Sequence, residues 1–175
     1  EITADLKAGD YVYITGTLYV ARDAAHKRMM EVLDEGKELP FNIQDQTIFY
    51  VGPTPSKPGQ VFGSGGPTTS GRMDAYSPRL IKLGLHAMIG KGYRSDAVKK
   101  AIVDYHGVYF GAIGGAGAMM SSCIEECEVI AFDDLGPEAI RKLKVKNMPL
   151  VVVIDHLGND LYEIGRKNYL KKDCK

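Results

Sequence analysis

The sequence predicts an α/β fold in which helices pack on a mixed β-sheet. Through the middle of the 175-residue chain, segments rich in β-branched and aromatic residues alternate with amphipathic helical segments. Strand-rich segments at both ends extend this core, which favours a mixed sheet over a purely doubly wound one. We therefore expect a single domain spanning residues 1–175, a length suited to one well-buried core.

The first third of the chain shows a strand, a helix and a second strand. The segment 11–20, YVYITGTLYV, predicts a strand because of its β-branched and aromatic residues, with an irregularity at Gly16. A helix is expected next, because apolar residues recur at helical spacing over 25–33 before a glycine ends it. Residues 47–51 predict the second strand. A loop dense in proline, glycine and serine follows over 52–66.

The middle third continues the alternation. A helix is expected to begin within TTSGRMD (residues 68–74), where threonine and serine are suitable N-caps, and to run to Leu83. Short strands are expected at 86–90 and 108–113. Between them lies a predicted helix that Ser95 caps.

The last third is predicted from turn residues and apolar runs. A short helix of small residues is expected to open at 114–117, and a strand is expected at 128–132. Proline in a first turn predicts a helix over 137–142. The segments 149–155 and 160–164 flank a four-residue turn and are expected to pair as a hairpin.

Composition excludes several classes of partner. Lys and Arg together number 22, as do Asp and Glu, so the formal net charge is zero and predicts no nucleic-acid or membrane-surface partner. No apolar run approaches the roughly 20 residues of a transmembrane helix. The N-terminal residues lack the pattern of a signal peptide. Three cysteines are an odd number for a disulfide framework, so we expect a reducing compartment, the cytoplasm.

The stretch GSGGPTTSGRMD at residues 63–74 has the composition of an anion-binding loop. A glycine-rich turn that leads into a helix exposes backbone N–H groups to a negative charge. Two nucleotide motifs fail here, because no Gly-Lys-Ser/Thr tripeptide occurs and Thr68 replaces the third glycine of G-x-G-x-x-G. These failures argue against a free-standing nucleotide-binding protein and favour a smaller anion.

Three cations point to a carboxylate. The planar guanidinium of Arg72 matches a carboxylate with two parallel hydrogen bonds. Arg22 and Lys91 follow predicted strands directly, and ligand crevices of α/β sheets form at strand ends. The structural alternative is that the glycines make a tight turn, that Arg72 pairs with Asp74, and that the other cations are solvated.

Five elements of the sequence occur in the same order as in a known family. They are RDAAHKR at 22–28, GPTTSGRMDAY at 66–76, MIGKG at 88–92, GAIGGAGA at 111–118 and DDLGPEAI at 133–140. Together they resemble the C-terminal domain, or separate β subunit, of the iron–sulfur (class I) fumarate hydratases and the related L-tartrate dehydratases. The resemblance covers nearly the whole chain.

The resemblance implies a swivelling β/β/α-type domain of a hydro-lyase that interconverts fumarate and (S)-malate, a reaction of the tricarboxylic acid cycle. Activity then requires an α subunit, whose three cysteines carry a [4Fe–4S] cluster that acts as a Lewis acid on the substrate hydroxyl. This chain would hold no metal. By position, Arg22, Arg72 and Lys91 correspond to residues that bind the dicarboxylate substrate, and Thr68 to a threonine proposed for proton transfer. The implied assembly is a hetero-oligomer in which β subunits can also contact one another.

Alternatives remain open from the residues alone. A threonine hydroxyl is a very poor base, so Thr68 could instead cap the helix that carries Arg72. The three cysteines are interpreted as core or surface thiols. His26 can face the same way as Arg22 and support it. The chain could also be the β subunit of an L-tartrate dehydratase or, in a different class, a non-catalytic carboxylate-binding or assembly module.

Overall fold

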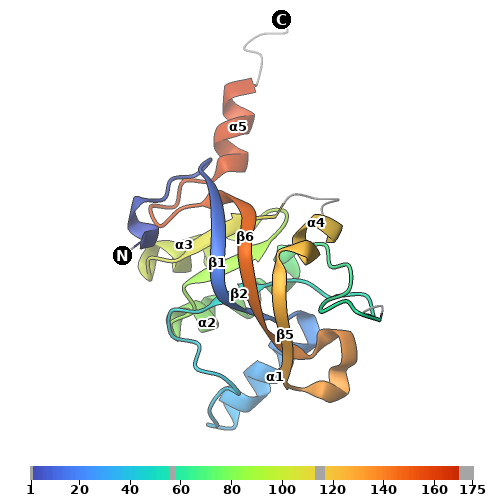
Figure 1. The fold of residues 1–175 in the computed structure, drawn as a ribbon. Helices are drawn as coiled ribbons and strands as arrows, with labels where there is room; N and C mark the ends of the chain where they lie inside the picture. Colours follow the sequence, from blue (N-terminus) through green and yellow to red (C-terminus); the bar gives the residue numbers. More distant parts are fainter. Residues whose placement is uncertain (1, 56–57, 113–116, 170–175) are drawn as a thin grey trace, which may run out of the picture.

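The computed structural model describes residues 2–55, 58–112 and 117–169. Within these residues, six strands form one mixed sheet in the order β1-β2-β3-β4-β6-β5, and β1 also pairs with β6 (Figure 1). The strands are β1 (Tyr11–Val20), β2 (Thr47–Phe49), β3 (Ala87–Gly90), β4 (Val108–Gly111), β5 (Ile124–Ala131) and β6 (Ile140–Ile154). Because β1 pairs at both its sides, β1, β2, β3, β4 and β6 close into a barrel.

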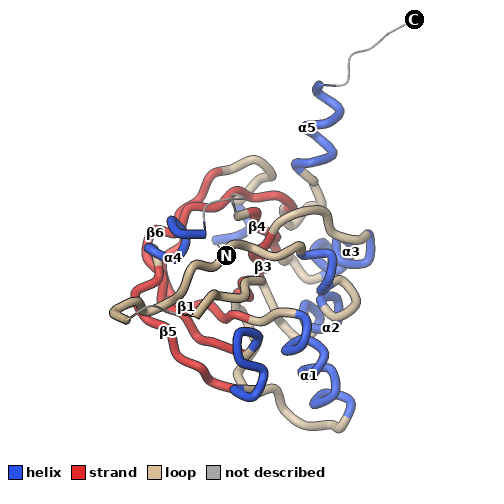
Figure 2. The backbone as a smooth tube through the Cα atoms, turned by 90° about the vertical axis from the view of Figure 1, so that its right-hand side faces the viewer, coloured by secondary structure: helices blue, strands red, loops and turns tan. Residues whose placement is uncertain are grey.

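The helices connect and flank these strands. The α-helices are α1 (Asp23–Asp34), α2 (Ser77–Lys82), α3 (Asp96–Asp104), α4 (Gly117–Ser122) and α5 (Leu161–Tyr169). Three short 3₁₀ helices are η1 (Ile2–Asp5), η2 (Ser70–Met73) and η3 (Asp133–Glu138). Figure 2 shows α1, α2 and α3 together on one side of the strands.

Strand direction divides the sheet into two parts. β1 to β4 run parallel to their neighbours, and helices α1, α2 and α3 lie in the connections between them. β6 runs antiparallel to β1, β4 and β5. The pairing of β1 with β6 shifts register between Ile14 and Gly16, which confirms the predicted irregularity, and Gly16 has a positive φ of 138°. The predicted mixed α/β sheet is therefore confirmed.

Two apolar cores lie on opposite faces of the strands. One includes Leu18, Phe49, Ile89, Phe110 and Val152, all from barrel strands. The other joins the sheet to the helices and includes Met29, Tyr50, Leu80, Ile102 and Tyr109. The alternation of side chains along each strand supplies both cores at once, because neighbouring residues face opposite sides.

The helix predicted to begin within residues 68–74 is wrong as a continuous helix. A four-residue 3₁₀ helix, η2, occupies this stretch, and α2 begins separately at Ser77. Pro78 lies in the first turn of α2, where a missing N–H is tolerated, but it could not continue a helix from η2. Asp74 turns its carboxylate to the backbone N–H of Ser95 (2.6 Å) and not to its own helix.

Three predictions for the last third are corrected. The expected strand at 128–132 begins earlier, at Ile124, as β5. The expected helix over 137–142 is wrong, because β6 begins at Ile140 and pairs with both β1 and β5. The first strand of the expected hairpin, 149–155, is confirmed as the end of β6, but its second strand is wrong. The segment after the turn forms α5, where Asp160 Oδ1 accepts a hydrogen bond from Tyr162 N (2.9 Å) and caps the helix. The predicted short helix is present as α4, which begins at Gly117, while the rest of its expected start, 114–116, and the expected strand end at 113 lie outside the described residues.

No helix among the described residues is both long and apolar enough to cross a bilayer.

The barrel core predicts a large cost for cavity formation. Leu18 is fully buried, so Leu18→Ala should lower the free energy of unfolding by about 2–5 kcal/mol. Leu157→Ala is the matched control, because Leu157 is 68% exposed, and it should change stability by less than about 0.5 kcal/mol. Urea denaturation measures both, and equal effects would contradict the barrel core.

Candidate functional site

The four predicted site residues lie where β1, β2 and β3 end. Arg22 stands at the N-cap position of α1 just after the end of β1, without a capping hydrogen bond from its side chain, and Lys91 follows β3 directly. The loop that carries Thr68 is tied between β2 and β3: Thr68 N donates to the Tyr50 carbonyl oxygen (2.8 Å), and Thr69 pairs with Lys91 in an isolated bridge. These strands are neighbours in the sheet, so their ends bring the four residues to one edge.

Arg22 and Arg72 share one carboxylate. Arg72 Nε lies 2.8 Å from Asp23 Oδ1, and Arg22 Nη2 lies 3.7 Å from Asp23 Oδ2. The Arg72 side chain is 53% exposed. The structural alternative in which Arg72 pairs with Asp74 is therefore wrong. Asp23 instead joins the two arginines from separate segments of the chain.

Glycine and a second carboxylate hold the Arg22 side chain. A Cβ atom added to Gly52 would overlap Arg22 Nη1, so the guanidinium lies directly against the Gly52 backbone. Glu138 Oε1 lies 3.7 Å from Arg22 Nη2. Arg22 Nε is buried and has no hydrogen-bond partner among the described residues.

The loop residue Ser70 is held by hydrogen bonds with Lys91 and Tyr109. Its N–H donates to the Lys91 carbonyl oxygen (2.9 Å), and its hydroxyl lies 2.9 Å from that of the buried Tyr109. The Tyr109 hydroxyl also donates to the Gly92 carbonyl oxygen (3.0 Å). A Cβ atom at Gly90 would overlap Ser70 Oγ, so glycine is required for this close approach.

The buried Arg94 holds the end of the same loop at Asp74. Arg94 is fully buried at its side chain, and its Nε donates to Asp74 Oδ1 (2.7 Å). Its Nη2 donates to Ser77 Oγ (2.8 Å). The guanidinium lies 5.4 Å from the centre of the Tyr50 ring and 5.0 Å from that of Tyr109. A buried charge is tolerated only when it is paired and hydrogen-bonded, and this set of partners meets that requirement.

Residues 1–165 match the family described as Fumarase C-terminus. The chain belongs to this family. It is 42% identical over 152 residues to the anaerobic class I fumarate hydratase of Escherichia coli, covering 86% of this chain and 28% of that protein. The mitochondrial fumarate hydratase 1 of Leishmania major gives the same identity and coverage.

A further relative matches at nearly its full length. The putative L(+)-tartrate dehydratase subunit beta of Methanocaldococcus jannaschii is 39% identical over 173 residues, covering 95% of this chain and 89% of that protein. The chain thus spans less than a third of the fumarate hydratases named above and most of this subunit. Both forms are consistent with a unit of the fumarase C-terminal family that occurs alone or at the end of a longer chain.

His26 contacts the backbone of Arg22. It is fully buried, and its Nδ1 donates to the Arg22 carbonyl oxygen (2.8 Å). Burial lowers the pKa of His26 to about 4, so the ring is neutral near pH 7. His26 Nε2 has no partner among the described residues. The neutral ring therefore holds the backbone of Arg22 and adds no charge to the site.

The helix-capping alternative for Thr68 is not supported. Thr69, not Thr68, stands at the N-cap of η2, and its side chain makes no capping hydrogen bond. Since η2 has only four residues and 3₁₀ geometry, the helix-dipole contribution expected at Arg72 is also absent. Thr68 is half-buried in the loop, and its role in proton transfer stays a prediction.

Three residues of the site were missed by the sequence analysis. Asp23 follows Arg22 directly, so its charge was visible, but its partner Arg72 is distant in sequence. Glu138 and Arg94 likewise act across long separations. The one available signal was the motif at 133–140, which contains Glu138.

The described cysteines do not form a ligand set for an iron–sulfur cluster. Cys123 Sγ lies 3.5 Å from the Met119 carbonyl oxygen, and burial raises the pKa of the Cys127 thiol. A cluster ligand needs the thiolate, which burial disfavours at Cys127. No group of three or more histidine, cysteine or acidic side chains in the described chain could hold a metal ion. Cys174 lies outside the described residues.

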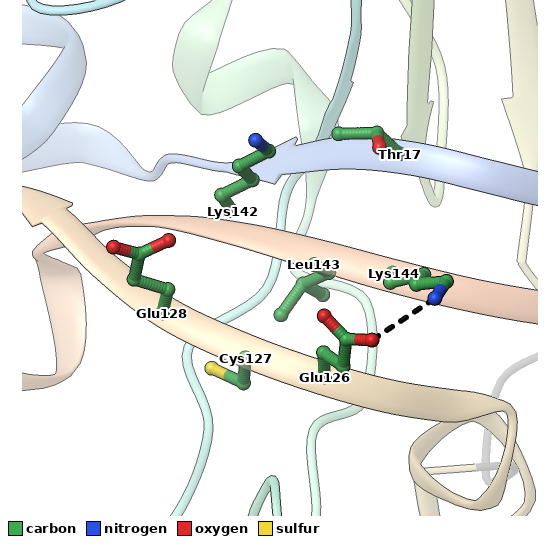
Figure 3. A pocket seen from close by; sticks show the side chains of 7 residues that line it. All are labelled: Thr17, Glu126, Cys127, Glu128, Lys142, Leu143 and Lys144. Atoms are coloured by element: carbon green, nitrogen blue, oxygen red, sulfur yellow. Dashed lines mark hydrogen bonds and ion pairs between the residues drawn. The ribbon is translucent and has the colours of Figure 1, made fainter.

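A separate hollow of about 290 Å³ lies over β5 and β6. Figure 3 shows its lining, where Glu126 pairs with Lys144 at 2.9 Å and Glu128 lies near Lys142. Its charges balance, so it offers no net attraction for a dianion. The hollow contains none of the four predicted residues.

His26 predicts an acid-sensitive fold. The folded pKa of about 4 lies below the unfolded value of 6.5, so the unfolded chain binds the proton first as the pH falls. Stability from this residue is present above pH 6.5 and should fall by about 2 kcal/mol between pH 7.5 and 5. Urea denaturation at both values measures it. The His26→Gln variant should have a shallower pH dependence, and identical slopes would contradict the assignment.

Gly52 predicts a way to move Arg22 without changing charge. In Gly52→Ala the new methyl group should displace the flexible guanidinium, while the unfolding free energy changes by less than about 1 kcal/mol. A crystal structure and urea denaturation of the variant check this. Gly66→Ala is the control, because a Cβ atom there meets nothing within 4 Å. An Arg22 side chain that stays in place would contradict the contact.

Proposed function

We propose that this chain, acting as one domain over residues 1–175, binds the carboxylates of a four-carbon substrate in a hydro-lyase that interconverts fumarate and (S)-malate. The observation that carries the proposal is the pair of arginines on Asp23 at the strand ends where Thr68 and Lys91 also lie. The fumarate hydratases among its relatives support the substrate.

The charges of the site suit a dicarboxylate. Arg22, Arg72 and Lys91 supply three cations, and no carboxylate of the described residues lies within ion-pairing distance of Lys91 Nζ. Guanidinium groups can bind a carboxylate through paired hydrogen bonds, and the ammonium acts as a point charge. Loss of a proton next to a carboxylate moves negative charge onto it, so a fixed arginine would stabilise the transition state more than the substrate.

Thr68 is proposed to take part in proton transfer. Its backbone N–H donates to the Tyr50 carbonyl oxygen, which holds Thr68 at the end of β2, next in sequence to the bridge between Thr69 and Lys91. A threonine hydroxyl needs a base or a nearby charge to give up a proton near pH 7. We expect that group to come from the partner subunit.

The partner is proposed to be an α subunit that carries the [4Fe–4S] cluster. The relative named as a subunit beta supports an assembly of separate chains, and the longer fumarate hydratases support a second portion beyond this one. The cluster would supply a Lewis acid. We also propose a hetero-oligomer in the cytoplasm, in which β subunits can touch one another.

A second substrate has its own observation. The L(+)-tartrate dehydratase subunit beta matches along 89% of its length, so L-tartrate is the second candidate. A non-catalytic carboxylate-binding or assembly module is the alternative from another class. Assays of the reconstituted complex with fumarate and with L-tartrate decide among the three, because the module would turn over neither.

Arg72→Ala tests the proposed function. The variant should lower fumarate hydration by the reconstituted complex at least about a hundredfold, because one charge-assisted contact with the substrate is lost. Co-purification with the α subunit and the thermal midpoint should stay close to those of the unchanged chain, since Arg72 is exposed. Arg79→Ala is the matched control, as Arg79 pairs with Asp34 on the surface. Near-normal turnover in Arg72→Ala would remove Arg72 from the site.

A further inference from the structure

The motif DDLGPEAI has no role in the substrate contacts proposed above, yet it packs against the start of α1. Its residues 133–138 form η3, and Glu138 Oε2 accepts a hydrogen bond from Ala24 N (2.8 Å). Asp134 Oδ1 accepts one from Arg28 Nη1 (2.6 Å). η3 is therefore bound to α1 at two points, Ala24 in the first turn and Arg28 in the second.

Glu138 also lies next to Arg22, one of the proposed substrate-binding cations. While Oε2 binds Ala24 N, Oε1 lies 3.7 Å from Arg22 Nη2. The same Arg22 nitrogen lies 3.7 Å from Asp23 Oδ2, and Asp23 Oδ1 lies 2.8 Å from Arg72 Nε. The four side chains form one row, Glu138–Arg22–Asp23–Arg72, that crosses from η3 through α1 to η2.

The two carboxylates are electrostatically unfavourable for a site that binds a dianion. Like charges at this range repel, so each carboxylate weakens attraction for a dicarboxylate. A long arginine side chain also loses conformational freedom when it binds a ligand, at a cost of roughly 0.5–1.5 kcal/mol unless it is already ordered. Asp23 contacts Arg72 at Nε, the nitrogen farthest from the outer end of the guanidinium. This contact orders the side chain and leaves its outer end for a ligand.

We infer that Asp23 and Glu138 are positioning residues that fix Arg22 and Arg72 in the orientation that receives a substrate carboxylate. The inference rests on the proposed function for the identity of the ligand. It gives the motif at 133–140 a purpose, because η3 places Glu138 on Arg22. It also makes Arg22 and Arg72 one unit, so a change at either end of the row alters both.

The sign of the effect separates positioning from simple charge. Asp23→Asn and Glu138→Gln each remove a negative charge, which by electrostatics alone would tighten dicarboxylate binding. Positioning predicts the opposite. In the reconstituted complex, each variant should raise the KM for the substrate and the Ki of succinate, a four-carbon dicarboxylate that cannot be hydrated, by roughly five- to tenfold. Asp34→Asn and Glu126→Gln are the controls, since both remove an acid from a surface ion pair elsewhere and should change neither constant.

A second measurement does not depend on activity. The Nε–H signals of arginine in ¹⁵N-labelled chain report the order of each guanidinium, and Asp23→Asn should shift the Arg72 signal and speed its exchange with solvent. An unmoved Arg72 signal, or a lower Ki in either variant, overturns the inference while turnover by the unchanged complex upholds the proposed function. If the unchanged complex neither turns over nor binds a dicarboxylate, the proposed function fails, and the Nε–H signals decide whether the row orders the arginines.

Discussion

The buried ion pair between Arg94 and Asp74 is the contact on which the arrangement of the site depends. It joins the end of the glycine-rich loop to the segment after β3, and the Arg94 guanidinium lies over the rings of Tyr50 and Tyr109. The hydrogen bond between the hydroxyls of Ser70 and Tyr109 holds the start of η2. With both ends fixed, Arg72 is carried on a short turn whose backbone cannot drift from Lys91. A buried charge is a costly way to hold a loop, and it is justified where position matters more than stability.

Charge in this chain separates into two layers with different tasks. Arg94 is fully buried and donates hydrogen bonds to Asp74 and Ser77. Arg22 and Arg72 lie farther out, and their partners leave part of each guanidinium accessible. The buried pair of Arg94 and Asp74 is neutral overall, so it does not compete with Arg22 and Arg72 for an anion. The chain therefore combines a rigid base with cations that remain available at its surface.

The sequence predicted β1, α1 and α3 well because each has a local signal. β1 is rich in β-branched and aromatic residues, α1 has apolar residues at helical spacing and a terminating glycine, and Ser95 caps α3. The second half of β6 was predicted, as a strand over 149–155. Its first half was missed because Pro137 indicated a helix over 137–142, and only pairing with β1 and β5 selects a strand there. The strand ends indicated where Arg22 and Lys91 would lie. Asp23 and Glu138 could not be assigned, since their partners depend on tertiary contacts.

The exposure of Arg72 explains why the proposed chemistry needs a second surface. The Arg72 side chain is 53% exposed, so it binds a carboxylate in competition with water, and such contacts contribute little in a high dielectric. Stabilising charge in a transition state requires water to be excluded around the donors. The described chain supplies the cations and their supports on one side only. A covering partner would lower the local dielectric at Arg22 and Arg72, so the same contacts would strengthen without any change within this chain.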